Sequence, residues 1–380
     1  MGYHAISRPD QAAAGRPSGH PPSQAVSDRA GLLVPAARRP PGGGPGDDLT
    51  AAEVAAVLVL AGRAPSLHNT QPWRFRPLPA GIELLADPGR QLPVIDPERR
   101  ELTISCGAAL FGLRLGLRSI GRLADTQLRP ENVPERVQSP LLARVLASGR
   151  AALTADEAEM VAAVPHRHTH RGAFSPIQVP PRLLDQLTAE AAAEGCELVL
   201  VTSHEQQARL AEITRRAAAQ QQASPQVRAE LARWVRPVGS SARDGVPARA
   251  LAPPPRPDDH DDDLPRRDFG WPGAEQGVTD PAAAQTAGAV AVLMSAGDSA
   301  TDWLRAGQAL NRLLLRAASR WVFASLQSQP LELPAYRVEV RTVLGGDGWP
   351  QMLLQLGRAN VAPATPRRPR SDLVTNDPAD

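Results

Sequence analysis

Residues 63–76 read Arg-Ala-Pro-Ser-Leu-His-Asn-Thr-Gln-Pro-Trp-Arg-Phe-Arg, and the interpretation of the whole chain starts from this stretch. Apolar residues at helical spacing precede it, so residues 49–62 are predicted to form a helix. Pro65 ends that helix, and the alternation of residues after Pro72 predicts a strand over 73–78. The short polar side chains between the prolines can donate and accept hydrogen bonds, which suits the edge of a flat heterocycle. A turn that satisfies only its own backbone is the alternative interpretation.

The stretch resembles the Ala-Pro-Ser-x-x-Asn-x-Gln-Pro-Trp signature of the flavin-dependent nitroreductase superfamily. With His68 to Arg74 in this order, it is similar more narrowly to the Acg family of FMN-binding oxidoreductases. The resemblance covers about residues 48–375 of the chain. It implies an α+β nitroreductase-like fold, FMN as the cofactor and NAD(P)H as the electron donor. Because the flavin would carry the redox chemistry, no catalytic acid–base pair need appear in the sequence.

The loop after Pro65 supplies the candidate contacts to the flavin ring. Amide and hydroxyl groups can satisfy the carbonyl and N–H groups of its pyrimidine edge, and a cation can stabilise anionic reduced flavin. An alternative role for the tryptophan is that of a core residue in the strand. The candidate ring-binding residues are Ser66, Asn69, Gln71, Pro72, Trp73 and Arg74.

The FMN phosphate requires several charge-assisted donors, and two arginine-containing segments are candidates for it. Residues 167–171, Arg-His-Thr-His-Arg, resemble the Arg-x-Ser-x-Arg/Lys run that nitroreductases use for this purpose. In an extended chain, Arg167, Thr169 and Arg171 face one side. The C-terminal basic residues of the family correspond to Arg367 and Arg368. An exposed basic turn and a solvated tail are the alternative interpretations, since every basic residue of this chain is arginine.

Composition excludes several classes of function. The chain has 380 residues, of which 42% are apolar, and its 42 basic and 40 acidic residues leave a net charge of +2. This length suffices for one large or two medium cores, and the charge balance gives no nucleic-acid or membrane signal. Cys106 and Cys196 lie in apolar segments, as small core residues of a cytoplasmic protein do. No signal peptide or membrane span is predicted.

The chain is predicted to contain a disordered Pro/Gly-rich tail and two folded halves. The tail is 1–47, and its Gly42–Gly46 run lacks the ending of a phosphate loop. The first half is 48–160 and the second half is 161–375. A Pro-, Arg- and Asp-rich segment at 236–281 is long enough to be a lid or a disordered insert.

Periodicity predicts further elements within these halves. Residues 130–150 are predicted to be a connection without a strand. The further predicted helices are 101–120, 154–164, 181–194, 205–222, 225–235 and 302–320. The further predicted strands are 82–86, 123–128, 197–202, 289–295, 337–344 and 351–356.

The two longest predicted helices share a pattern that favours internal duplication. Gly107-x-Ala109-Leu110-x-x-Leu113-x-Leu115 matches Gly307-x-Ala309-Leu310-x-x-Leu313-x-Leu315, although leucines at this spacing also recur by chance in core helices. Nitroreductases are usually homodimers with flavin between the subunits, so the resemblance implies that a fused pair copies this interface in one monomeric chain. The arginine run occurs in the second half alone, which predicts one FMN per chain.

Two functions remain open from the sequence. The first is a nitroreductase-like enzyme that uses NAD(P)H and FMN to reduce nitro compounds, quinones or similar small-molecule acceptors. The second is a non-catalytic protein that stores or shields FMN beneath the 236–281 segment. No metal site is predicted, because the alternating histidines at 166, 168 and 170 have no nearby Cys or carboxylate, and the acidic run at 258–263 lacks calcium-loop spacing.

Overall fold

The computed structural model describes residues 48–128, 140–172, 174–251, 264, 265, 267, 269, 288–359 and 365–375. The predictions for the tail at 1–47 and for the acidic run at 258–263 lie outside these residues. Among the described helices, none is long and apolar enough to cross a membrane.

The first half is built on a four-stranded antiparallel sheet with the order β1-β2-β4-β3. Helix α1 precedes this sheet, and its N-terminus is closed by a capping box between Thr50 and Glu53. Strands β1 and β2 form the predicted hairpin. The bounds are α1 Ala51–Ala61, β1 Trp73–Leu78, β2 Gly81–Ala86, α2 Arg100–Ser119, β3 Arg122–Leu128, β4 Leu141–Arg150 and α3 Ala155–Ala163.

The second half contains a second antiparallel sheet with the order β5-β8-β10-β9. Its central strands are almost fully buried and rich in Val, Leu and Met, as strands covered on both faces are. The bounds of its main elements are α4 Pro181–Ala192, β5 Cys196–Val201, α5 His204–Ala223, α6 Pro225–Arg233, β8 Ala289–Ser295, α7 Ala300–Ser319, β9 Val322–Gln327, α8 Gln329–Glu332, α9 Pro334–Leu344 and β10 Trp349–Arg358. Short strands β6 Val235–Arg236 and β7 Val246–Pro247 pair with each other, and α10 spans Arg370–Leu373.

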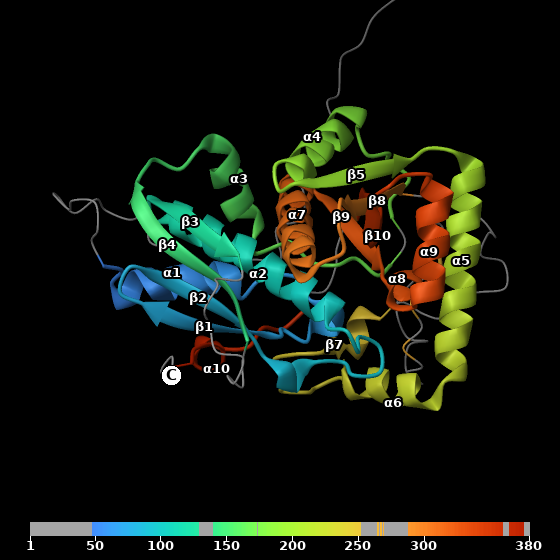
Figure 1. Cartoon of the computed structure of the whole chain (residues 1–380), viewed down its shortest axis with the longest axis horizontal. Helices are drawn as coiled ribbons and strands as arrows, with labels where there is room; N and C mark the ends of the chain where they lie inside the picture. The colour runs from blue at the N-terminus through green and yellow to red at the C-terminus, as the bar shows by residue number, and fades with distance from the viewer. Residues whose placement is uncertain are drawn as a thin grey trace, which may run out of the picture. The chain divides into compact units, whose positions relative to one another are not determined.

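Helices α2 and α7 cross between the two sheets (Figure 1). Glycines from both helices allow this crossing, because a Cβ at Gly307 would lie 2.0 Å from the carbonyl oxygen of Ile104. A Cβ at Gly107 would lie 2.3 Å from the carbonyl oxygen of Leu304. The two predicted glycines therefore meet at a backbone-to-backbone contact that no larger residue fits.

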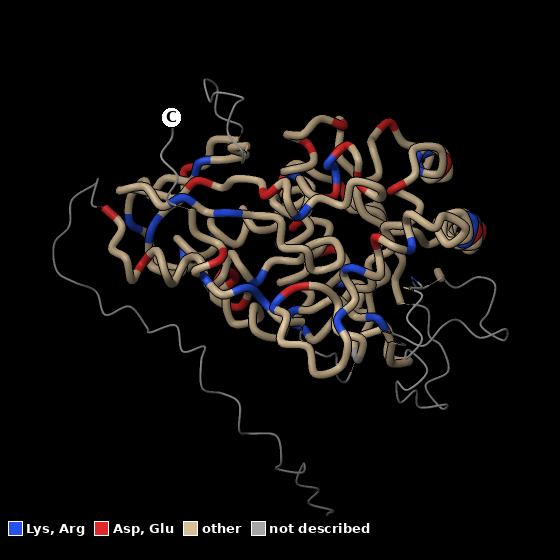
Figure 2. Tube along the Cα trace, turned by 90° about the horizontal axis from the view of Figure 1, so that it is seen from below, with Lys and Arg blue, Asp and Glu red and all other residues tan. Residues whose placement is uncertain are grey.

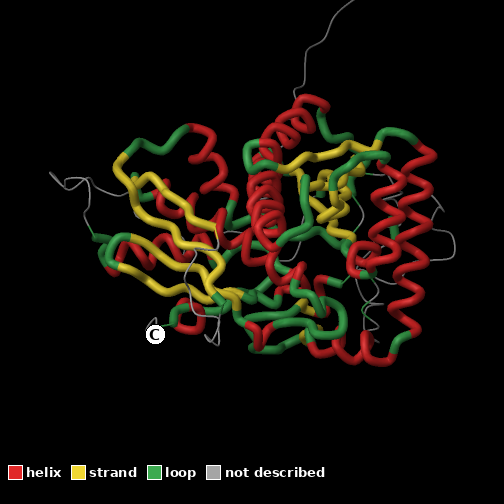
Figure 3. Tube along the Cα trace, viewed as in Figure 1, coloured by secondary structure: helices red, strands yellow, loops and turns green. Residues whose placement is uncertain are grey.

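The two halves share one arrangement of strands around their long helices. In each four-stranded sheet, two strands precede the long helix and two follow it, and the spatial order is first, second, fourth, third. The second half has additional helices: α5 and α9 pack on one face of its sheet and α4 and α7 on the other (Figure 3). The first sheet packs on α1 and α2 around Trp73 and Phe75.

Two secondary-structure predictions differ from the structure. Residues 337–344, predicted as a strand, belong to α9, which starts at Pro334 and turns Val338 to solvent while burying Val340 and Val343. The predicted connection at 130–150 contains β4, a central strand of the first sheet. Its Leu-, Ala- and Arg-rich sequence has helical propensity, which pairing with two neighbouring strands overrides.

Arginine and acidic residues alternate along the described trace instead of forming one charged face (Figure 2). Many form ion pairs, such as Arg316 with Glu190 at 2.8 Å and Arg118 with Glu157 at 2.7 Å. An arginine cluster without acidic partners is therefore a distinctive feature in this molecule.

Candidate functional site

The loop between α1 and β1, residues 62–72, has a backbone that ordinary side chains rarely adopt. His68, Asn69 and Gln71 have φ values of 48°, 57° and 50°. Each such residue costs on the order of 1–3 kcal/mol and persists only when its surroundings hold it. The hydroxyl of Ser66 accepts a hydrogen bond from the backbone N–H of Gln71 at 2.9 Å, which closes the loop on itself.

The amides of this loop bind two segments that lie far away in the sequence. The Asn69 Nδ2 donates to the carbonyl oxygens of Gly245 at 2.9 Å and Pro366 at 3.0 Å. The Gln71 side chain donates to the carbonyl oxygen of Arg243 at 2.9 Å and accepts from the backbone N–H of Arg368 at 2.9 Å. These contacts hold the strained loop in place. That either amide contacts the flavin ring stays a prediction.

The remaining residues predicted at the ring edge have other neighbours. Trp73 is fully buried in the core of the first half. Arg74 Nε bonds the Asp87 carboxylate at 3.2 Å, and the carbonyl oxygen of Pro72 accepts from the N–H of Asp87 at 2.9 Å. Of the predicted ring-edge residues, Ser66 alone lines the main cavity described next.

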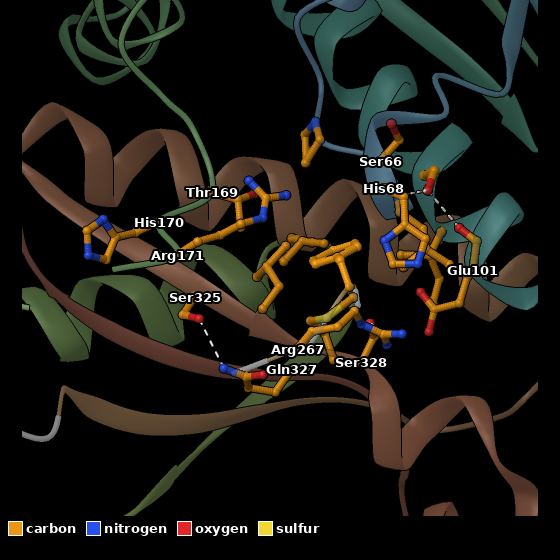
Figure 4. A pocket seen from close by; sticks show the side chains of 18 residues that line it. Ser66, His68, Glu101, Thr169, His170, Arg171, Arg267, Ser325, Gln327 and Ser328 are labelled. Carbon is orange, nitrogen blue, oxygen red and sulfur yellow. Dashed lines mark hydrogen bonds between the residues drawn. The ribbon is translucent and has the colours of Figure 1, made fainter. Parts of the chain in front are cut away.

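A cavity lined by both halves of the chain, with about 810 Å³ of empty space that includes its opening to solvent, contains the candidate site (Figure 4). Its walls come from the signature loop, the first turns of α2, the segment 169–171 and the end of β9. Arg267 and Phe269, from the predicted lid segment, also line it. Its polar and charged lining includes the side chains of Ser66, His68, Glu101, Thr169, Arg171 and Gln327.

Four arginines gather at this site: Arg63, Arg167, Arg171 and Arg367. Arg167 and Arg367 both donate to the carbonyl oxygen of Arg63, at 3.1 and 3.3 Å. Arg367 also bonds Asn69 Oδ1 at 2.9 Å and Thr365 Oγ1 at 2.7 Å. The guanidinium groups of Arg63 and Arg171 have no hydrogen bond or ion pair with any described residue.

Burial lowers the pKa of each of the four guanidinium groups, and neighbouring arginines add to this effect for Arg167 and Arg367. Burial lowers the pKa of Arg167 to about 10, with a smaller contribution from Arg63, and burial lowers the pKa of Arg171 to about 10. The pKa of Arg367 falls well below its ordinary value through burial and then through the charges of Arg167, Arg63 and Arg171. No described carboxylate offsets these charges, so an anion would bind here favourably.

Arg368 was predicted with Arg367, but its contacts differ. It donates to the carbonyl oxygen of Gln71 at 3.3 Å and lies 3.9 Å from the carboxylate of Asp87. Burial lowers its pKa, followed by the charge of Arg90. Arg368 therefore contacts the signature loop at Gln71.

The far side of the cavity carries acidic and aromatic groups. His68 contacts Phe269 edge to face at 5.3 Å, and burial, followed by the charge of Arg267, lowers the pKa of His68 to about 3. Arg267 pairs with buried Glu332 at 2.5 Å and bonds Ser328 Oγ at 3.2 Å. Figure 4 shows His68 and Glu101 on one side of the cavity and Arg171 and Thr169 on the other.

The three alternating histidines each stack on a different aromatic ring. His166 stacks on Trp321 at 5.1 Å, His168 on Phe323 at 4.5 Å, and His170 lies 4.7 Å from Phe174. Among the described residues, no group of three His, Cys, Asp or Glu side chains has the geometry of a metal site.

Several cavity residues were missed by the sequence analysis. Arg63 opens the quoted signature, so its position two residues before Pro65 was a usable signal. His68 lies within the same signature. Glu101 had no local signal, because only the tertiary fold brings it to the cavity, whereas Arg267 and Phe269 lie within 236–281, the segment predicted as a possible lid.

Comparison with known proteins identifies the family. No family model matches the chain. A Mycobacterium tuberculosis protein named "Putative NAD(P)H nitroreductase" is 36% identical over 328 residues, which cover 84% of this chain and 90% of that protein. A second protein from the same organism, "Putative NAD(P)H nitroreductase acg", is 27% identical. The matched residues cover 83% of this chain and 93% of that protein.

Two solved structures are also similar to part of the chain. One is a nitroreductase with bound FMN from Bacteroides fragilis, at 15% identity and a TM-score of 0.34. The matched residues cover 57% of this chain and 97% of that structure's chain. The other is an FMN-bound nitroreductase from Desulfitobacterium hafniense, at 13% identity, the same TM-score of 0.34 and the same coverage. On the strength of the sequence relatives, the chain belongs to the nitroreductase superfamily and, within it, to the Acg-like proteins.

Proposed function

We propose that this protein is an FMN-dependent NAD(P)H oxidoreductase that reduces nitro compounds, quinones or similar small-molecule acceptors. The observation that carries the proposal is the cluster of Arg63, Arg167, Arg171 and Arg367, which has no described acidic partner and adjoins the cavity lined by Ser66, Thr169 and Gln327. Cofactor sites are concave and combine apolar walls with a few placed polar groups. An anion with a flat organic body matches both features.

The donor set fits the phosphate of FMN. The Arg171 guanidinium and the Thr169 hydroxyl both line the cavity, two residues apart in the chain, and both can donate to phosphate oxygens. Arg63, Arg167 and Arg367 surround this end with further positive charge. A dianion here would relieve repulsion among four clustered cations, which a neutral ligand would leave in place.

Unpartnered polar atoms fit the flavin ring. Gln327 lines the cavity, and its Oε1 is buried without a hydrogen-bond partner while its Nε2 bonds Ser325 Oγ at 3.0 Å. The Nε2 of His68 is likewise buried and unpartnered. An acceptor at Gln327 and a neutral imidazole at His68 suit the alternating donors and acceptors of the ring edge.

Bound FMN would accept a hydride from NAD(P)H and pass two electrons to the acceptor. The chain's own residues would bind and orient the reactants. The arginines hold the phosphate end, the strained loop and Gln327 fix the ring, and Phe269 with His68 closes the far wall against water.

We further propose that the chain is a fused pair of nitroreductase-like halves, 48–160 and 161–375, with one flavin site. The shared strand order and the contact between Gly107 and Gly307 support the fusion. Residues 62–72 form the signature loop between α1 and β1, whereas residues 193–195 alone join α4 to β5. That short link leaves no room for a second signature loop at the equivalent position.

Storage or shielding of FMN is the second candidate function. It is supported by Arg267 and Phe269, which belong to the 236–281 segment and line the cavity. The pair of Arg267 with Glu332 anchors this part of the segment at the cavity wall. If the segment covers the flavin, nicotinamide cannot stack on the ring.

Turnover measurements separate the two candidates. The purified protein is expected to carry yellow FMN and to oxidise NADPH or NADH only when menadione or nitrofurazone is present. FMN binding without turnover in the native protein, together with turnover in Phe269→Ala, would support shielding. Failure to bind FMN under any condition would reject both.

A further inference from the structure

Glu101 stands out among the cavity residues because it is a buried carboxyl group with one unused oxygen. It lies in the first turn of α2, is 2% exposed and lines the cavity on the side opposite Arg171 (Figure 4). One oxygen, Oε1, accepts a hydrogen bond from the guanidinium of Arg100. Oε2 has no hydrogen-bond partner among the described residues.

Independent contacts fix the position of Glu101. The carboxylate of Asp96 caps α2, since its two oxygens accept from the backbone N–H groups of Glu101 at 3.1 Å and Leu102 at 2.8 Å. Arg100 is in turn held by the side-chain and backbone oxygens of Gln351, at 3.0 and 3.1 Å. A carboxyl group held on one oxygen, with the other free, is arranged to act on a bound molecule.

Charged groups from several elements set the proton affinity of Glu101. Burial raises its pKa to about 7, and the negative charges of Glu332 in α8 and Asp96 before α2 add to this, while Arg100 and Arg337 act in the opposite direction. Its cavity neighbours are His68, which burial keeps neutral, and Arg267, which pairs with Glu332. Glu101 therefore exchanges its proton near neutral pH, where general acids are most effective.

We propose that Glu101 is the proton donor to the electron acceptor bound in this cavity. The inference rests on the proposed oxidoreductase function. Reduction of a quinone to a hydroquinone requires one hydride, which NAD(P)H supplies through FMN, and one proton. The proton would pass from Glu101 Oε2 to a quinone oxygen, leaving the Glu101 carboxylate, which regains a proton from water. A nitro oxygen would be protonated in the same way as hydride reaches the nitro group.

The kinetic test uses the FMN-loaded full chain and the variant Glu101→Gln, which keeps an oxygen for Arg100 but has no acidic proton. Under anaerobic conditions, the bleaching of flavin by NAD(P)H should change less than about twofold, because hydride transfer to flavin needs no acid. Subsequent reoxidation by menadione should slow roughly 100-fold at about pH 6, the lower range for general acid catalysis. In the wild type this rate should fall about tenfold per pH unit above about pH 7, and in the variant it should be flat.

Two further variants serve as controls. Glu339→Gln removes a surface carboxylate of α9 that pairs with Arg216, and it should behave like the wild type. Glu332→Gln removes a negative charge that raises the pKa of Glu101, so the break in the pH profile should persist but move to lower pH. If Glu101→Gln retains the wild-type pH profile, Glu101 is not the donor.

A flavin-free measurement keeps this inference separate from the proposed function. Infrared difference spectroscopy of the wild-type apoprotein should show a protonated carboxyl band that disappears with a midpoint at about pH 7 and that is missing in Glu101→Gln. A Glu101 already ionised at about pH 5 would overturn the inference even if the enzyme reduces quinones. A correct titration in a protein that never reduces an acceptor would instead reject the oxidoreductase function.

Discussion

At the scale of single residues, the most informative side chain is Arg171. Its guanidinium lines the cavity without a described hydrogen-bond or ion-pair partner, whereas arginines such as Arg118 and Arg316 pair with carboxylates. Burial of an uncompensated cation costs stability, so its position is explained best by a ligand that carries negative charge.

Arg171→Ala is expected to weaken FMN binding by about ten- to a hundred-fold, because a charge-assisted hydrogen bond is worth roughly 1.5–3 kcal/mol. The apoprotein should keep its fold, since the Arg171 guanidinium has no hydrogen bond or ion pair with a described residue. FMN titration by fluorescence quenching, together with circular dichroism, measures both effects. Arg144→Ala is the matched control, because Arg144 pairs with Glu83 on the first sheet. Equal affinity in both variants would mean that the phosphate binds elsewhere.

At the scale of elements, the crossing of α2 and α7 holds the two halves together. The Asn311 side chain donates to the carbonyl oxygen of Ala108 at 2.8 Å, close to the contact between the two glycines. The cavity lies beside this crossing, since Ile104 and Leu310 of the two helices line it.

Gly307→Ala is expected to destabilise the protein by about 1–3 kcal/mol or more, because the new methyl group overlaps backbone atoms of α2 that cannot move aside. Its Cβ would lie 2.0 Å from the carbonyl oxygen of Ile104 and 2.7 Å from the Cα of Gly107. Urea unfolding followed by circular dichroism gives the change in free energy. Gly346→Ala is the control, with no atom within 4 Å of its added Cβ. Comparable stability of the two variants would show that α2 and α7 can move apart to accept the added methyl group.

Sequence patterns predicted the elements whose local signals agree with their tertiary surroundings. The hairpin of β1 and β2 and the helices α2 and α7 fall within a few residues of prediction, because apolar periodicity and glycine punctuation coincide there. Strand β4 and helix α9 were missed, since neighbouring strands and a helix-starting proline decide their structure. The pairing of β4 depends on contacts that a single sequence does not display, whereas Pro334 is a local signal for the start of α9.

The residues of the candidate site likewise divide into those that sequence motifs predicted and those that only tertiary contacts reveal. Ser66, Thr169 and Arg171 were predicted from motifs, and they line the cavity. Asn69 and Gln71 were predicted to face the flavin, but their side-chain bonds run to Gly245 and Arg243, in a segment whose folding the motif does not encode. Glu101 could not be found, because an acidic residue in the first turn of a helix is ordinary.

At the scale of the whole molecule, one flavin per chain is expected. Arg63 belongs to the first half and Arg167 and Arg171 to the second, so the phosphate end needs both. The ratio of flavin absorbance to protein in the purified chain measures this directly. The isolated segment 48–160 should bind no FMN by the same titration. Two flavins per chain, or tight binding by the isolated segment, would contradict the asymmetric arrangement.

The arginine cluster also links folding to the solution around the protein. Because four like charges are clustered together, any anion that occupies their site favours the folded state more as its concentration rises. Inorganic phosphate or sulfate in a purification buffer would then act as a weak competitor for FMN and as a stabiliser of the empty protein. The affinity measured for FMN, and the thermal stability measured without it, are therefore properties of the protein together with its buffer.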